Sequence, residues 1–273
     1  MTIRSILLHV DATPASIARV GFAQVLAARH GARLTALFGV RPHLSRAAFA
    51  YSAGAALRAA DEEGVPHEHE RERLRELLVG RDPDCAWCEV TGDSVRHAFV
   101  AEAIYADLLI VGPPPGVDED GAAPHGFVES VILDSGMPAM IVPNSDRQAT
   151  LGDRVVVAWN GSASAARALK SALPLLRQAA SVHVASWGPL PPVAPLSRLD
   201  VRAWLRRHDV ESELHAGASA AHVADDLAAL VGDVGADLVV MGCYGHSRIR
   251  EQVLGGVTRA LLARLPAPIL MSH

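Results

Sequence analysis

An internal repeat constrains this chain more than any other feature. Residues 106–112 read Ala-Asp-Leu-Leu-Ile-Val-Gly, and residues 236–242 read Ala-Asp-Leu-Val-Val-Met-Gly. Met-Pro-Ala-Met-Ile-Val at 137–142 likewise corresponds to Ala-Pro-Ile-Leu-Met-Ser at 267–272. The same shift along the chain relates both pairs, so we predict two copies of one structural unit.

The two copies also begin alike, and a polar stretch separates them. Ile-Leu-Leu-His-Val-Asp at 6–11 resembles Val-Val-Val-Ala-Trp-Asn at 155–160, and small residues follow both segments. A chain of 273 residues is long enough for two ordinary domains. Residues 143–152 are polar and rich in residues that break regular structure. We therefore predict one domain over 1–147 and a second over 148–273.

The composition and the periodicity predict an α/β fold. Half of the residues are hydrophobic and only 4% are aromatic, so Ala, Val, Leu and Ile must build the core. In the second half, short apolar strands are expected near 154–159, 181–187, 211–215, 237–241 and 268–271. Amphipathic helices are expected near 163–178, 196–208, 219–232 and 256–265. This alternation predicts two tandem domains, each with a doubly wound parallel sheet.

Two further features bear on how the halves are arranged. The last strands, near 139–142 and 268–271, each leave an exposed edge, and we expect these edges to pair within one chain. The sequence also allows the whole chain to form a homodimer. The first half carries extra helical sequence over 44–80, which the sequence allows to cover a sheet face, to contact the other half or to form a lid.

A glycine-rich segment in the second half has the layout of a phosphate-binding loop. Gly242, Gly245, Gly255 and Gly256 lie between a buried strand and the start of a helix. Glycines let backbone N–H groups approach an anion, and the helix adds the positive end of its dipole. The alternative is that these glycines only make turns and a helix start.

The same segment resembles the universal stress protein family. Its spacing is similar to the signature Gly-x2-Gly-x9-Gly-Ser/Thr, and the flanking strands 236–242 and 267–271 strengthen the likeness. One residue departs from the pattern, since Gly256 stands where the family has Ser or Thr, and the nearest hydroxyl is that of Thr258. The resemblance covers nearly the whole chain as two linked copies.

The resemblance implies that the second half binds ATP or a related adenine nucleotide, with or without Mg²⁺. It places the phosphates on the loop backbone and the adenosine toward Asn160, at the end of the first strand of this half. Trp187, at the end of the second strand, either stacks on adenine or only fills the sheet edge. The implied binding residues are Asn160, Trp187, Met241, Gly242, Gly245, Gly255, Gly256, Val257 and Thr258. An amide at Asn160 carries no charge for Mg²⁺, so we expect slow or absent hydrolysis and assign no catalytic residue.

The corresponding loop of the first half has lost most of this chemistry. Pro113, Pro114 and Pro115 remove backbone donors, and residues 118–120 add three negative charges. A shifted register would pair Gly116 with Gly126 and rescue the loop in part. Asp11 ends the first strand here, where the second half has an asparagine.

The cysteines and histidines give weaker signals. Cys85 and Cys88 form a Cys-x2-Cys pair, which favours two buried thiols on one strand over half of a zinc or thiol-exchange site. Cys243 lies in the glycine loop and is a candidate for oxidation. His67 and His69 have no metal-binding helical spacing, so we expect surface histidines and no metal site.

Composition excludes several classes of protein. The net charge of −5 gives no basic surface for nucleic acid, and no apolar run is long enough to cross a membrane. With no signal sequence at the start, we expect a cytoplasmic protein. The resemblance to the universal stress proteins implies a nucleotide-binding sensor or regulatory protein of the stress response. The alternatives are a weak Mg-dependent ATPase and a scaffold that binds no nucleotide.

Overall fold

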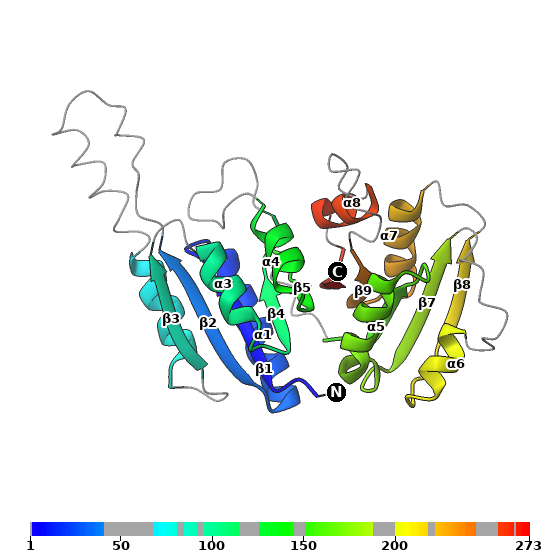
Figure 1. Cartoon of the computed structure of the whole chain (residues 1–273), viewed down its shortest axis with the longest axis horizontal. Coiled ribbons are helices and arrows are strands. Elements are labelled where there is room, and N and C mark those ends of the chain that lie inside the picture. Colours follow the sequence, from blue (N-terminus) through cyan, green and yellow to red (C-terminus); the bar gives the residue numbers. More distant parts are fainter. Residues whose placement is uncertain are drawn as a thin grey trace, which may run out of the picture.

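Two similar α/β halves lie side by side in the structure (Figure 1). The structure is a computed structural model that describes residues 2–40, 68–80, 85–91, 95–114, 126–144, 151–187, 200–217, 222–243, 256–264 and 266–273. The predicted boundary at 147 lies outside the described residues. No helix in these ranges is long and apolar enough to cross a membrane.

The elements of each half follow the predicted alternation of strands and helices. The first half contains β1 (Ser5–Val10), α1 (Ala15–His30), β2 (Arg33–Val40), β3 (Cys85–Thr91), α3 (Val95–Ala103), β4 (Leu108–Val111), α4 (Phe127–Ser135) and β5 (Ala139–Ile141). The second half contains β6 (Arg154–Ala158), α5 (Ala163–Leu176), β7 (Ser181–Trp187), α6 (Val201–Arg206), β8 (Glu213–Gly217), α7 (Val223–Asp233), β9 (Leu238–Gly242), α8 (Gly256–Arg264) and β10 (Ile269–Ser272).

The ten strands form one continuous sheet in the order β3-β2-β1-β4-β5-β10-β9-β6-β7-β8. Every pairing within a half is parallel. The halves join where β5 and β10 pair antiparallel, with Ile141 opposite Ile269. These are the two edges that the sequence predicted to pair, and their burial inside one sheet removes both exposed edges.

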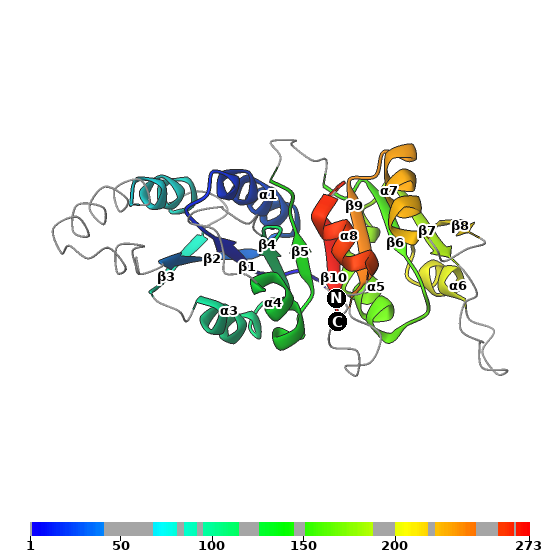
Figure 2. The same cartoon turned by 90° about the horizontal axis from the view of Figure 1, so that it is seen from above.

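Helices cover both faces of the sheet, as a parallel sheet with buried strands requires. Seen from above, α1 lies on one face of the first half, with α3 and α4 on the other (Figure 2). In the second half, α5 and α6 lie on the face opposite α7. The core accordingly divides into two clusters of buried aliphatic side chains, one on each face. This confirms the α/β fold class.

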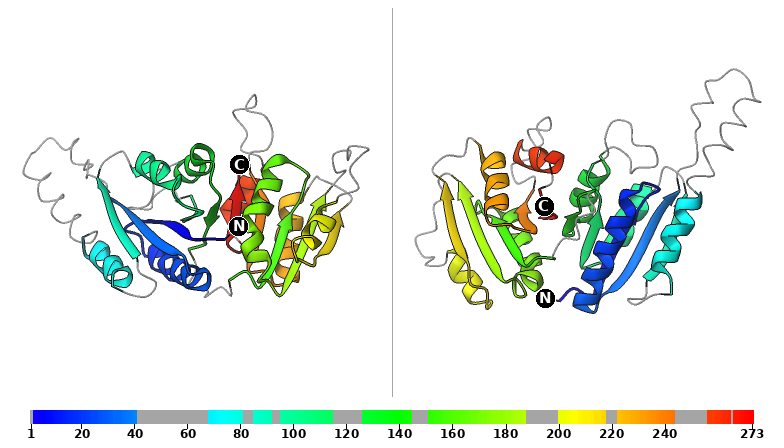
Figure 3. Two further views of the ribbon diagram at one scale, coloured as in Figure 1. Left: turned by 60° about the horizontal axis from the view of Figure 1, so that its bottom comes forward. Right: turned by 180° about the vertical axis from the view of Figure 1, so that it is seen from behind.

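Part of the extra sequence in the first half covers a sheet face. Residues 68–78 are helical and lie beside α1 along the first-half sheet (Figure 3). Leu74 and Leu78 are fully buried in the core on that side, and the Gln24 side chain donates a hydrogen bond to the Leu77 carbonyl at 2.7 Å. The rest of the segment, 44–67, lies outside the described residues.

The prediction of two buried thiols on β3 was wrong for one of them. Cys85 is buried, whereas Cys88 is exposed. Side chains alternate between the two faces of a strand, so residues three positions apart point in opposite directions. β3 is also an edge strand, and its outer part is less well covered than a central strand. His69 lies exposed on the 68–78 helix, as expected, and His67 lies outside the described residues.

Candidate functional site

The strand order of the second half reverses next to β6, which lies between β7 and β9. Ligands of open α/β sheets bind outside the carboxyl ends of the strands at such a reversal. Ala158 at the end of β6 lies opposite Met241 near the end of β9. Asn160 and Gly242 therefore flank this reversal, which brings together two of the residues that the sequence assigned to one site.

The start of α5 completes this corner of the sheet. Ser162 caps the helix, accepting a hydrogen bond from the Ala165 N–H at 3.1 Å, and its own N–H donates to Asn160 Oδ1 at 3.1 Å. Gly161 has a φ of 73°, which permits the tight turn between strand and helix. The 14-residue helix thus directs the positive end of its dipole toward the strand ends.

Gly242 is needed here because α5 approaches β9 closely. A Cβ atom at this position would lie 2.3 Å from the Ala165 nitrogen and 2.7 Å from Ser164 Oγ. No side chain fits between the two backbones. Gly242 therefore has a packing role in addition to the ligand-binding role that the sequence assigned to it. Ser162 and Ser164 were not recognised as site residues from the sequence.

The other predicted residues occupy different environments. Met241 is buried, Val257 is half-buried, and Gly256 begins α8. The Thr258 side chain is buried in the first turn of α8, with 5% of the residue exposed. Gly245 and Gly255 lie outside the described residues, together with the rest of 244–255.

Trp187 ends β7 and packs over the edge strand. A Cβ atom on Gly217, its partner in β8, would lie 2.3 Å from the indole Cδ1. The indole is half-buried against the core that faces α7 and α8. This contact provides the edge-filling role that the sequence allowed, and stacking on adenine stays a prediction.

The first half has a buried polar network at the equivalent corner. Asp11 accepts hydrogen bonds from the Thr13 N–H at 3.2 Å and from the Ser16 hydroxyl at 2.7 Å. The Arg19 guanidinium donates to the His9 carbonyl at 3.0 Å and lies 3.5 Å from Asp11 Oδ2. All five residues have at most 9% of their surface exposed. The side chains of this network therefore occupy the corner of the first half.

The network keeps Asp11 ionised. Burial acts to raise the pKa of this carboxyl group, but Arg19, His9 and the hydrogen bonds from Thr13 and Ser16 outweigh it and lower the pKa to about 2. Arg19 also lies directly against the end of β4, since a Cβ atom on Gly112 would be 2.3 Å from its Nη2. No role was predicted for Arg19 from the sequence.

The two corners differ in what occupies them. Leu8 pairs with Ile110 as Val157 pairs with Val240, and this register makes Ala158 and Ala168 the counterparts of His9 and Arg19. The second half thus has methyl groups where the first half has an imidazole and a guanidinium. This leaves the second corner without the internal cation that neutralises the first.

The first-half loop is described only in part. Gly126 precedes α4 with a φ of 73°, and Ser130 lies within that helix. Gly116 and the acidic residues 118–120 lie outside the described residues, so the shifted register stays a hypothesis.

Cys243 is not an activated thiol. The residue is buried, with 1% of its surface exposed, and burial raises the pKa of the thiol to about 12. The nearby charge of Arg167 opposes this shift without cancelling it. Because the thiolate is the reactive form, the expectation of an oxidation-sensitive position was wrong.

Comparison with known proteins identifies the fold of the chain and the family of its second half. The sequence model of the universal stress protein family matches residues 152–273. A universal stress protein from Archaeoglobus fulgidus DSM 4304 shares 17% identity, with 99% of this chain and 96% of that chain covered and a TM-score of 0.68. A functionally unknown protein from Pseudomonas aeruginosa PAO1 shares 16% identity, with 99% and 92% covered and a TM-score of 0.60.

Because the sequence identities to these structures are low, the likeness establishes only the fold of the full chain. None of the curated proteins matches the sequence. The family match in the second half coincides with the corner formed by β6, α5 and β9. Residues 152–273 therefore form a domain of the universal stress protein family, joined to a first half of the same fold.

Proposed function

We propose that this protein is a cytoplasmic regulatory protein of the stress response whose second half binds ATP or a related adenine nucleotide. The observation that supports this most strongly is the difference between the two corners. In the first half, Arg19 and Asp11 neutralise each other inside the protein. In the second half, Ala158 and Ala168 stand in place of His9 and Arg19, and the start of α5 directs the positive end of its dipole to the same corner, which favours an anionic group there.

In this proposal the phosphates bind the backbone N–H groups of the loop between β9 and α8. The loop glycines are Gly242, Gly245, Gly255 and Gly256, and Val257 follows them at the start of α8. Adenosine lies toward Asn160, which is exposed at the end of β6. Asn160 already accepts a hydrogen bond from Ser162, and its amide keeps donors for a ribose hydroxyl.

Binding without efficient turnover is the second part of the proposal. Efficient hydrolysis needs a carboxylate to hold Mg²⁺ beside the phosphates, and Asn160 offers only a neutral amide. We expect the purified protein to release phosphate from ATP no faster with Mg²⁺ than without it. Mg²⁺-dependent turnover that follows the protein through purification would instead support the weak ATPase.

The binding test combines mass spectrometry with calorimetry. Ligand released from freshly purified protein should contain an adenine nucleotide. Gly245→Pro removes one backbone donor from the loop, so ATP affinity should fall by about tenfold or more, as expected for a lost hydrogen bond to a charged group.

The matched control is Gly116→Pro in the first-half loop, which should leave ATP affinity unchanged. Equal losses in both variants would show that the effect is not specific to the second half. Absence of co-purified nucleotide and of binding heat at several temperatures would leave a scaffold as the function.

A further inference from the structure

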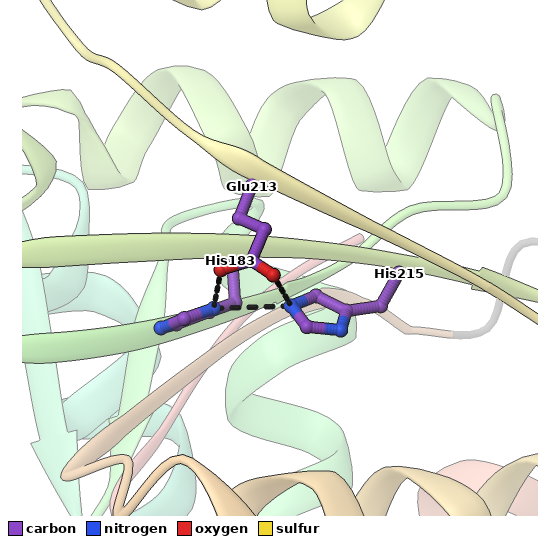
Figure 4. A group of neighbouring side chains, drawn as sticks. All are labelled: His183, Glu213 and His215. Carbon is purple, nitrogen blue, oxygen red and sulfur yellow. Dashed lines mark hydrogen bonds and ion pairs between the residues drawn. The ribbon is translucent and has the colours of Figure 1, made fainter.

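Two histidines and a glutamate converge on the face of the second-half sheet, away from the corner described above (Figure 4). They come from two neighbouring strands, with His183 on β7 and Glu213 and His215 on β8. His183 lies directly opposite Glu213 in the register, and His215 lies opposite Ala185. Because side chains two residues apart in a strand share a face, all three point to the same side of the sheet.

We propose that His183, Glu213 and His215 form a binding site for a zinc ion. His183 Nδ1 and His215 Nε2 lie 3.1 Å apart. Glu213 Oε2 lies 3.6 Å from His183 Nδ1, and Oε1 lies 3.8 Å from His215 Nε2. Nitrogen ligands bind zinc at about 2.0–2.1 Å, which puts two ligand atoms of a tetrahedral site roughly 3.3 Å apart. The three groups therefore need only small movements to share one ion.

The chemistry of the ligands selects zinc over a hard cation. Imidazole nitrogen suits zinc and other late transition metals, whereas magnesium and calcium prefer sets of oxygen ligands. Two histidines and one carboxylate are a known zinc set that leaves a fourth position for water. Imidazole ligates metal in its neutral form, so metal affinity at this site should depend on pH.

One ligand of this site is held by the sheet, and another is exposed to the solvent from which an ion would enter. The exposed fraction of the side chains rises from 13% at His183 to 29% at His215 and 67% at Glu213. His183 is thus held by the sheet, while Glu213 reaches from solvent. Zinc here would tie the edge strand β8, whose side chains are mostly exposed, to β7.

The fold itself does not require this cluster. The register of β2 with β3 matches that of β7 with β8, so the first half has its own residues at the three equivalent positions. These residues are Thr35, Ala86 and Cys88. Among the residues that the structure describes, no other group of three such side chains converges in this way.

The test is a calorimetric titration of the full chain with zinc chloride, after removal of metal and nucleotide and without a histidine tag. Wild type should bind one equivalent. His215→Ala should lower the affinity by about tenfold or more, since a ligand contributes far more than the supporting groups whose loss costs about 10–100-fold. Glu213→Gln should lower it in the same direction. His97→Ala, which removes an exposed histidine from the first half, should have no effect.

A second readout separates a metal site from a hydrogen-bonded histidine pair. Zinc should raise the melting temperature of wild type and of His97→Ala, and should not raise that of His215→Ala, because only a folded-state site is stabilised by its ligand. Wild type and His215→Ala with the same zinc affinity would overturn the proposal, as would a failure of wild type to bind one equivalent. Either result would leave the cluster as a His–His hydrogen bond beside Glu213.

Discussion

Gly242→Ala should destabilise the protein by about 3 kcal/mol. The new methyl group would lie 2.3 Å from the Ala165 nitrogen and 2.6 Å from the Ser164 carbonyl carbon, and both atoms belong to the backbone of α5. Overpacking typically costs about 1–3 kcal/mol. The displaced helix start would also strain the cap between Ser162 and Ala165, and a lost cap costs about 1 kcal/mol.

Urea unfolding of the two proteins measures this loss, and hydrogen exchange of the α5 amides locates it. Gly232→Ala is the matched control, because a Cβ atom at this exposed position in α7 meets nothing within 4 Å. That variant should be unchanged or more stable, by up to about 1 kcal/mol, since alanine favours a helix. A Gly242→Ala protein as stable as wild type would show that α5 does not pack on β9 in this way.

The strands and helices could be predicted from the sequence because the pattern of apolar residues is the strongest sequence signal of secondary structure. The strands predicted near 154–159, 181–187 and 237–241 all lie within two residues of β6, β7 and β9. β8 was predicted at 211–215 and found at Glu213–Gly217. An edge strand with mostly exposed side chains has weak hydrophobic alternation, so its register is set by pairing with β7 and not by its own pattern.

The candidate site could be predicted only where its residues lie at positions that a family pattern marks. Asn160 and Gly242 were predicted because the resemblance to the universal stress proteins assigns ligand contacts to the end of the first strand and to the glycine loop. Arg19 was missed, although its spacing from Ser16, Val20 and Ala23 places it on the buried face of α1. The zinc-binding cluster was missed because its ligands lie on different strands, and the register that unites them is not readable from the spacing.

Removing the positive charge of Arg19 from the first-half network should lower the free energy of unfolding by about as much as Gly242→Ala does. Arg19→Met keeps an unbranched apolar side chain of similar length but leaves the Asp11 carboxylate buried without its guanidinium. Loss of one partner of a buried ion pair costs about 3–5 kcal/mol. Urea unfolding at pH 7 should show a loss of this size, and the double variant Asp11→Asn with Arg19→Met should recover part of it, because no unpaired charge then remains.

The dependence of this loss on pH follows from the direction of the Asp11 shift. In wild type the pKa of Asp11 is lowered from 3.8 to about 2, so the ionised group contributes roughly 2 kcal/mol above pH 4, and this contribution disappears as the pH falls toward 2. In Arg19→Met, burial acts with less opposition and the pKa of Asp11 should rise, so protonation relieves the buried charge as the pH falls. The difference in free energy of unfolding between the two proteins should therefore be largest at pH 7 and shrink below pH 4. A difference that stays constant from pH 7 to pH 3 would show that Arg19 stabilises the first half by packing alone, and that the corner is not neutralised by an ion pair.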